Sequence, residues 1–84
     1  MQPTPDLVRQ YIADHLDCEH IEVYGDGAHF EALIVSKAFE GQNTLARHRT
    51  VYQALGDRMR AEIHALSMRN LTPAEYAATQ DDNG

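Results

Sequence analysis

One histidine stands out because it lies among apolar residues at the point where a strand is expected to begin. His64 follows Ile63 and precedes Ala65 and Leu66. Imidazole nitrogen is a ligand that iron accepts alongside thiolates, so His64 is a candidate metal ligand. The alternative is a histidine at a strand edge that hydrogen-bonds to the backbone. These residues alone leave metal chemistry and packing both open.

The elements that must position this histidine can be predicted from capping residues and hydrophobic spacing. Thr4-Pro5 and Thr72-Pro73 are typical helix starts, the second within a capping box that ends at Glu75. We expect helices over 5–16, over 45–59 with a break at Gly56, and from 73 to about 78. Strands are expected over 20–24, 29–36 and 63–71. Residues 1–79 are predicted to form a single domain, and 80–84 a disordered tail.

The expected sheet is mixed. The turn residues Gly25-Asp26-Gly27 predict that the first two strands pair antiparallel. The crossover to the third strand is long enough for a parallel, right-handed return beside the second. This predicts an α+β fold with sheet order 1-2-3 and the helices on one face. Because parallel neighbours begin at the same end of a sheet, His29 and His64 are expected to meet at one edge.

The amino-acid composition limits the cellular compartment and the kinds of site that we expect. Cys18 is the only cysteine in 84 residues, which excludes a disulfide framework and a Cys-cluster zinc site. A single, inert thiol fits a reducing compartment, and we expect a cytoplasmic protein. The N-terminus does not read as a signal peptide, and no apolar run has the length of a membrane span, so no membrane partner is expected. We find no nucleophile–base pair, phosphate-binding loop or paired acids, and no enzyme is predicted.

The distribution of charge leaves a second function, nucleic-acid binding, open. The formal net charge of −6 argues against nonspecific nucleic-acid binding by the whole surface. Residues 43–60 nevertheless carry four arginines against one acid, Asp57. These arginines are Arg47, Arg49, Arg58 and Arg60. They are expected either to line a solvated helix face or to serve a nucleic-acid-binding transcriptional regulator.

Several motifs, taken in order, resemble the BolA family, and most of all its IbaG-type bacterial branch. The match covers roughly residues 6–77. The motifs are Gly25-Asp26-Gly27-Ala28-His29-Phe30, Phe39-Glu40-Gly41, Leu45-Ala46-Arg47-His48, Val51-Tyr52, Ile63-His64-Ala65-Leu66 and Thr72-Pro73-Ala74-Glu75. The resemblance implies a two-layer α/β sandwich similar to the class II KH fold. The segment Gly41-Gln42-Asn43-Thr44 lacks the second glycine of the GXXG loop with which KH domains clamp nucleic acid.

The resemblance also implies a partner and a cofactor. BolA-like proteins pair with monothiol glutaredoxins of the CGFS type and share a [2Fe–2S] cluster, in iron homeostasis and stress response. By position, His64 corresponds to the family's ligand near the last strand and His29 to the second ligand. No cofactor is expected in the isolated chain, because histidine alone does not hold such a cluster. DNA and a weak homodimer remain open as further partners.

Overall fold

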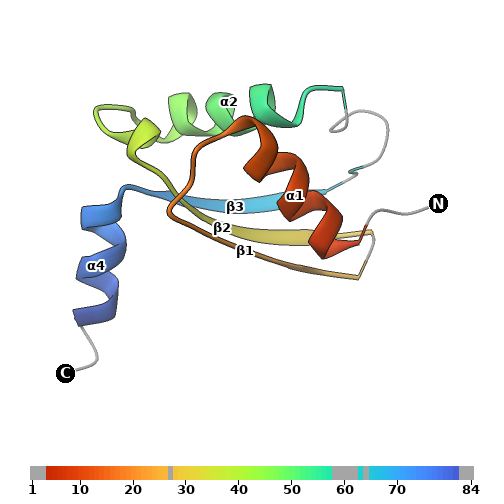
Figure 1. Cartoon of the computed structure of the whole chain (residues 1–84), viewed down its shortest axis with the longest axis horizontal. Coiled ribbons are helices and arrows are strands. Elements are labelled where there is room, and N and C mark those ends of the chain that lie inside the picture. The colour runs from red at the N-terminus through yellow and green to blue at the C-terminus, as the bar shows by residue number, and fades with distance from the viewer. Residues whose placement is uncertain (1–3, 27, 58–62, 64, 82–84) are drawn as a thin grey trace.

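The computed structural model describes residues 4–26, 28–57, 63 and 65–81. The chain forms three described α-helices, a short 3₁₀ helix and three strands (Figure 1). In chain order they are α1 (Pro5–His15), β1 (His20–Gly25), β2 (Phe30–Val35), η1 (Lys37–Phe39), α2 (Thr44–Leu55), β3 (Leu66–Leu71) and α4 (Pro73–Asp81). This confirms the predicted α+β class and is compatible with the class II KH likeness.

Side-chain caps begin the helices at, or within one residue of, the predicted starts. The Thr4 hydroxyl caps α1 and the Asn43 side chain caps α2, each accepting a backbone N–H three residues on. At α4 the capping box is complete. The backbone N–H of Glu75 donates to Thr72 Oγ1 at 3.1 Å, and that of Thr72 donates to Glu75 Oε1 at 2.9 Å.

The sheet has the predicted order β1-β2-β3, with β1 antiparallel and β3 parallel to the central β2. In register, Ile21 pairs with Ile34, and Phe30 pairs with Leu66. Because side chains alternate across a strand, each strand has one face toward the helices and one away from them.

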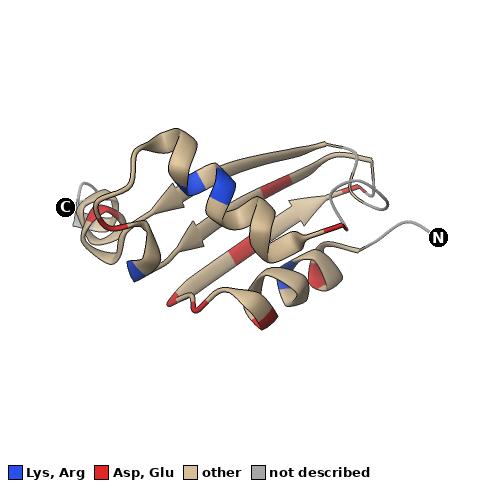
Figure 2. Cartoon of the chain, turned by 90° about the horizontal axis from the view of Figure 1, so that it is seen from above, with Lys and Arg blue, Asp and Glu red and all other residues tan. Residues whose placement is uncertain are grey.

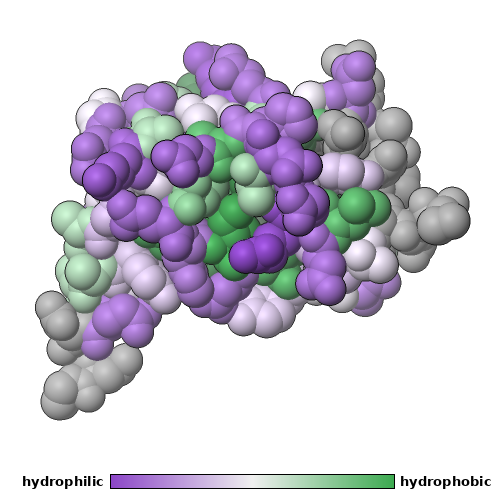
Figure 3. Space-filling view, in the orientation of Figure 1, coloured by the Kyte–Doolittle hydropathy of each residue, from purple (hydrophilic) through white to green (hydrophobic). Residues whose placement is uncertain are grey.

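The core lies between the sheet and the helices α1 and α2. Its buried members include Val8, Ile12, Ile21, Phe30, Ile34, Phe39, Val51, Leu55 and Ile63. Figure 3 shows the outside of this arrangement, with apolar side chains visible in a narrow zone and hydrophilic ones around it. Within the described residues, no helix is long and apolar enough to cross a membrane.

Helix α4 departs from the prediction that the helices share one face. It lies past the end of β3 and extends away from α1 and α2 (Figure 1). The Tyr76 ring stacks on the His20 ring with centroids 5.1 Å apart. Since Ile21 points into the core, His20 points to the opposite face of the sheet, and α4 covers a corner of that face.

Element boundaries also differ from the predicted ones. β3 begins at Leu66 rather than at 63, although Ile63 is fully buried. α4 continues to Asp81, past its predicted end near residue 78. α2 ends at Leu55 because Gly56 takes a positive φ of 60°, as the predicted break requires. The expected short helix after it falls mostly outside the described residues.

The 3₁₀ helix η1 was not predicted. Its start is set by Ser36, whose Oγ accepts from the N–H of Ala38 at 3.1 Å and donates to the carbonyl of Asp17 at 2.7 Å. This one buried hydroxyl joins the end of β2 to the segment between α1 and β1. The Ser36 hydroxyl therefore stabilises the end of the sheet that lies opposite the start of β2.

Candidate metal-binding edge of the sheet

The starts of β2 and β3 lie side by side, as the sequence predicts. The backbone N–H of Phe30 donates to the carbonyl of Ala65 at 2.9 Å, just before the two strands enter their parallel pairing. His29 and Ala65 therefore share one end of the sheet. His64 directly precedes Ala65 in the chain but lies outside the described residues. Its role as a ligand stays a prediction.

The turn before His29 is held by one carboxylate. Asp26 Oδ1 accepts from the N–H groups of Ala28 at 3.0 Å and of His29 at 2.9 Å. These backbone bonds, led by the one from His29, lower the pKa of Asp26. The backbone of His29 is thus fixed while its side chain is exposed.

Gly25 is required by the same turn. A β-carbon at Gly25 would collide with the carbonyl oxygen of His29 and would lie 2.6 Å from Cδ1 of Phe30. The backbone of β1 approaches the start of β2 this closely because Gly25 pairs with Phe30 in the antiparallel ladder. The glycine therefore helps to set where His29 is presented.

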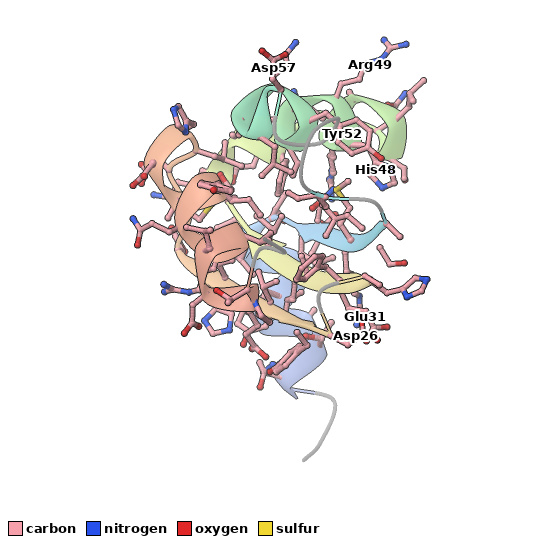
Figure 4. All side chains as sticks on the ribbon, turned by 90° about the vertical axis from the view of Figure 1, so that its right-hand side faces the viewer. Asp26, Glu31, His48, Arg49, Tyr52 and Asp57 are labelled. Carbon is pink, nitrogen blue, oxygen red and sulfur yellow. The ribbon has the colours of Figure 1, made fainter. Side chains whose placement is uncertain are left out.

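A shallow hollow of about 410 Å³ opens beside His29. Figure 4 looks onto this end of the molecule, with Asp26 and Glu31 labelled near the start of β2. The hollow is lined by Gly25, Asp26, His29, Phe30, Glu31, Ala65 and Ser67. Among the described residues, no three His, Cys, Asp or Glu side chains gather closely enough to hold a metal ion. The described side chains that line this hollow offer one imidazole, that of His29, which is a ligand that iron accepts, and the carboxylates of Asp26 and Glu31.

Cys18 is unsuited to act as a thiolate ligand at this edge. Burial, helped by the neighbouring charge of Asp17, raises the pKa of the Cys18 thiol to about 11. Its Sγ lies 3.3 Å from the carbonyl of Leu16, to which it donates. The backbone N–H of the next residue, Glu19, donates to the carbonyl of Val35, which lies at the far end of β2 from His29. That strand spans roughly 17 Å, so Cys18 and His29 belong to opposite ends of the sheet.

Arg47, a candidate for nucleic acid, is bound within the protein. Its guanidinium donates to the carbonyls of Gln42 and Asn70, each at 2.9 Å, and pairs with both carboxylate oxygens of Glu75. Its side chain is only 15% exposed. The sequence predicts that Glu75 belongs to a capping box, but no sequence pattern pairs this acid with an arginine on another helix.

The remaining candidate arginines are divided. Arg49 is exposed on α2 and points away from the sheet, as Figure 4 shows. Arg58 and Arg60 lie outside the described residues. With Arg47 engaged inside the fold, Arg49 is the described member of this set that is available to phosphate.

Fold and site together define a small α+β binding module with an exposed histidine at the start of its central strand. The family model described as BolA-like protein matches residues 11–75. The chain belongs to the BolA-like family. Members of this family are regulatory or adaptor proteins, and this chain is accordingly not an enzyme.

Individual relatives agree with this assignment. The acid stress protein IbaG of Escherichia coli K12 is 32% identical over 78 residues, covering 92% of this chain and 93% of IbaG. A bolA homologue from Coxiella burnetii is 45% identical, with a TM-score of 0.78 and coverage of 89% and 97%. Yeast Fra2 is 33% identical, with a TM-score of 0.76 and coverage of 92% and 87%. The BolA domain of SufE1 from Arabidopsis thaliana is 36% identical, with a TM-score of 0.73 and coverage of 81% and 89%.

Proposed function

We propose that this chain is an adaptor that pairs with a monothiol glutaredoxin of the CGFS type and shares a [2Fe–2S] cluster with it, in iron–sulfur and iron homeostasis. His64 and His29 would be its ligands. The likeness to yeast Fra2 and to the BolA domain of SufE1 supports a role as a partner module. The cytoplasm, where thiols stay reduced, suits this role.

One observation carries the proposal, the parallel pairing of β2 with β3. It sets His29 beside Ala65, the residue that follows His64 in the chain. Because His64 directly precedes Ala65 in the chain, this pairing supports the proposal that the two histidines serve one site. The Asp26 bonds fix the His29 backbone and leave its imidazole exposed to a partner.

The chain's own contribution would be neutral imidazole nitrogen. Replacing thiolate by imidazole removes negative charge from an iron–sulfur cluster and raises its reduction potential, which is the chemistry such a group would supply here. With its high pKa, Cys18 would take no part.

The test is co-expression with a monothiol glutaredoxin, followed by visible absorption and circular dichroism of the purified complex. His64→Ala is expected to change the cluster spectrum and shorten the lifetime of the cluster, and His29→Ala to do so to a smaller degree. His64→Cys is expected to lower the midpoint potential, because thiolate restores negative charge.

Two variants serve as matched controls. His15→Ala removes an exposed histidine at the C-terminal end of α1. This end of the helix leads into β1 and lies away from His29. Cys18→Ser removes the thiol at the far end of the sheet. Both are expected to keep the wild-type spectrum. A cluster that is unchanged in His64→Ala, with the fold intact by far-ultraviolet circular dichroism, would refute the ligand assignment.

A further inference from the structure

The strand β3 is an outer strand of the sheet. It pairs with β2 on one side, and no described strand pairs with it on the other. Seen from above in Figure 2, α2 crosses over β3 toward its C-terminal end. An outer strand carries a row of backbone groups that another extended chain can pair with.

The register shows which backbone groups point outward. In a parallel ladder, alternate residues of a strand direct both backbone groups to the same neighbour. The carbonyls of Ala65 and Leu71 accept from β2 at 2.9 Å and 3.0 Å, so the odd-numbered residues of β3 face β2. Leu66, Met68 and Asn70 therefore direct their backbone groups to the free edge. Among the described residues, Arg47 occupies the last of these positions by donating to the carbonyl of Asn70.

A groove of about 330 Å³ follows this edge between α2 and α4. Figure 4 shows His48 and Tyr52 on the side of α2 that faces the edge of β3. The groove is lined by Thr44, Arg47, His48, Met68, Arg69, Asn70, Leu71, Glu75 and Thr79. Among the side chains that line it, those of Met68 and Leu71 are apolar and that of His48 is aromatic.

The side chain of Asn70 is a second, independent indication that the groove binds a ligand. It lines the groove and is only 8% exposed, yet within the described part of the chain neither Oδ1 nor Nδ2 of its side chain has a hydrogen-bond partner. Buried side-chain amides are nearly always satisfied in folded proteins. A peptide group offers both the donor and the acceptor that this amide lacks.

The charge of the groove selects the kind of partner. The carboxylate of Glu75 is neutralised by Arg47. Arg69 is exposed on β3, pairs with no acid among the described residues, and lines the same groove as His48. On a chain of net charge −6, this edge presents an arginine outward. An acidic side chain opposite Arg69 would form a favourable cross-strand pair.

We propose that the free edge of β3 binds an extended acidic segment of a partner protein as a fourth strand. Its apolar side chains would lie toward Met68 and Tyr52, and its alternate, acidic side chains would lie beside Arg69. The groove shares no lining residue with the hollow beside His29, and the proposal does not depend on the proposed cluster. A second copy of this chain is a poorer occupant, since each copy carries the same net charge of −6 and offers β3 itself, whose outward charge is Arg69.

The test uses a fluorescein-labelled nine-residue peptide that alternates valine and aspartate, titrated with the full chain and followed by anisotropy. Saturable binding is expected, with slowed amide hydrogen exchange at Leu66 and Met68. The same peptide N-methylated at alternate amides is expected to lose binding, because it cannot pair with the strand edge. That comparison leaves the protein unaltered, so it does not depend on any variant folding.

Two protein variants test the charge. Arg69→Glu is expected to weaken binding by about fivefold or more. Arg49→Glu, which reverses an exposed arginine that points away from the sheet, is expected to leave binding unchanged. Equal binding of the N-methylated peptide would overturn the proposal, as would equal losses in both variants. It would also fail if an oligothymidylate bound the edge in preference, or if sedimentation showed a dimer that the peptide did not disrupt.

Discussion

Arg47 on α2 and Glu75 on α4 form a two-pronged ion pair, with Nη1 to Oε1 at 2.6 Å and Nη2 to Oε2 at 3.2 Å. The same guanidinium holds the carbonyl of Asn70 at the end of β3 and lies 6.0 Å from the Phe39 ring. One side chain therefore joins α4, the end of β3 and the segment before α2.

Arg47→Ala is expected to lower the free energy of unfolding by about 1 to 3 kcal/mol, mainly because the carbonyls of Gln42 and Asn70 lose their donor. The partly exposed pair with Glu75 adds little to this loss. Urea denaturation followed by circular dichroism measures it. Arg49→Ala, at an exposed position on the same helix, is the matched control and should cost almost nothing. Equal losses in the two variants would contradict the role given to Arg47.

Acid is expected to weaken the same junction. The bond from Arg47, with that from Thr72, lowers the pKa of Glu75 to about 2. Because its pKa is lower in the folded state than the ordinary 4.5, the ionised carboxylate stabilises the fold above that value. This contribution is lost as the pH falls from about 4.5 toward 2.

Glu75→Gln removes the titrating group. The variant should therefore show a smaller fall in stability than the wild type across this pH window, as measured by urea midpoints at several pH values. Glu40→Gln, which neutralises an exposed acid after η1, supplies the comparison. If Glu75→Gln kept the full wild-type pH dependence, the pair would not be the source of the acid sensitivity.

The Cys18 thiol is expected to react slowly in the folded protein. Its pKa of about 11 leaves it protonated at neutral pH, and the thiolate is the reactive form. Labelling with a disulfide reagent at pH 7 should be slow, should quicken as the pH rises toward 11, and should become fast in urea. Fast labelling of the folded chain at pH 7 would show that the thiol is more exposed than the fold indicates.

Gly25→Ala is expected to disturb the position of His29. The added methyl group would meet the His29 carbonyl and the Phe30 ring, so the turn must shift, at about 1 to 3 kcal/mol in stability. The His29 resonances in a proton–nitrogen correlation spectrum should move. Gly41→Ala is strained by a φ of +78° but meets no atom within 4 Å, so it should leave those resonances in place.

Much of this fold was predictable because its determinants are local. Thr4, Asn43 and the Thr72–Glu75 box start helices through bonds to residues at most three positions away. Gly56 ends α2 by a backbone preference of its own. The turn before His29 and the length of the crossover are enough to predict an antiparallel pair followed by a parallel one, and hence the shared edge.

Only the tertiary structure decided where the long side chains go. Arg47 finds its partners 23 and 28 residues away, and Tyr76 meets His20 across the molecule. Such contacts depend on how finished elements pack, and no local spacing encodes them. The sequence by itself determined the order of strands and the end of the sheet to which His29 belongs. Packing decided that Arg47 is engaged within the fold, that α4 leaves the helical layer, and that β3 pairs with one described strand and exposes Arg69.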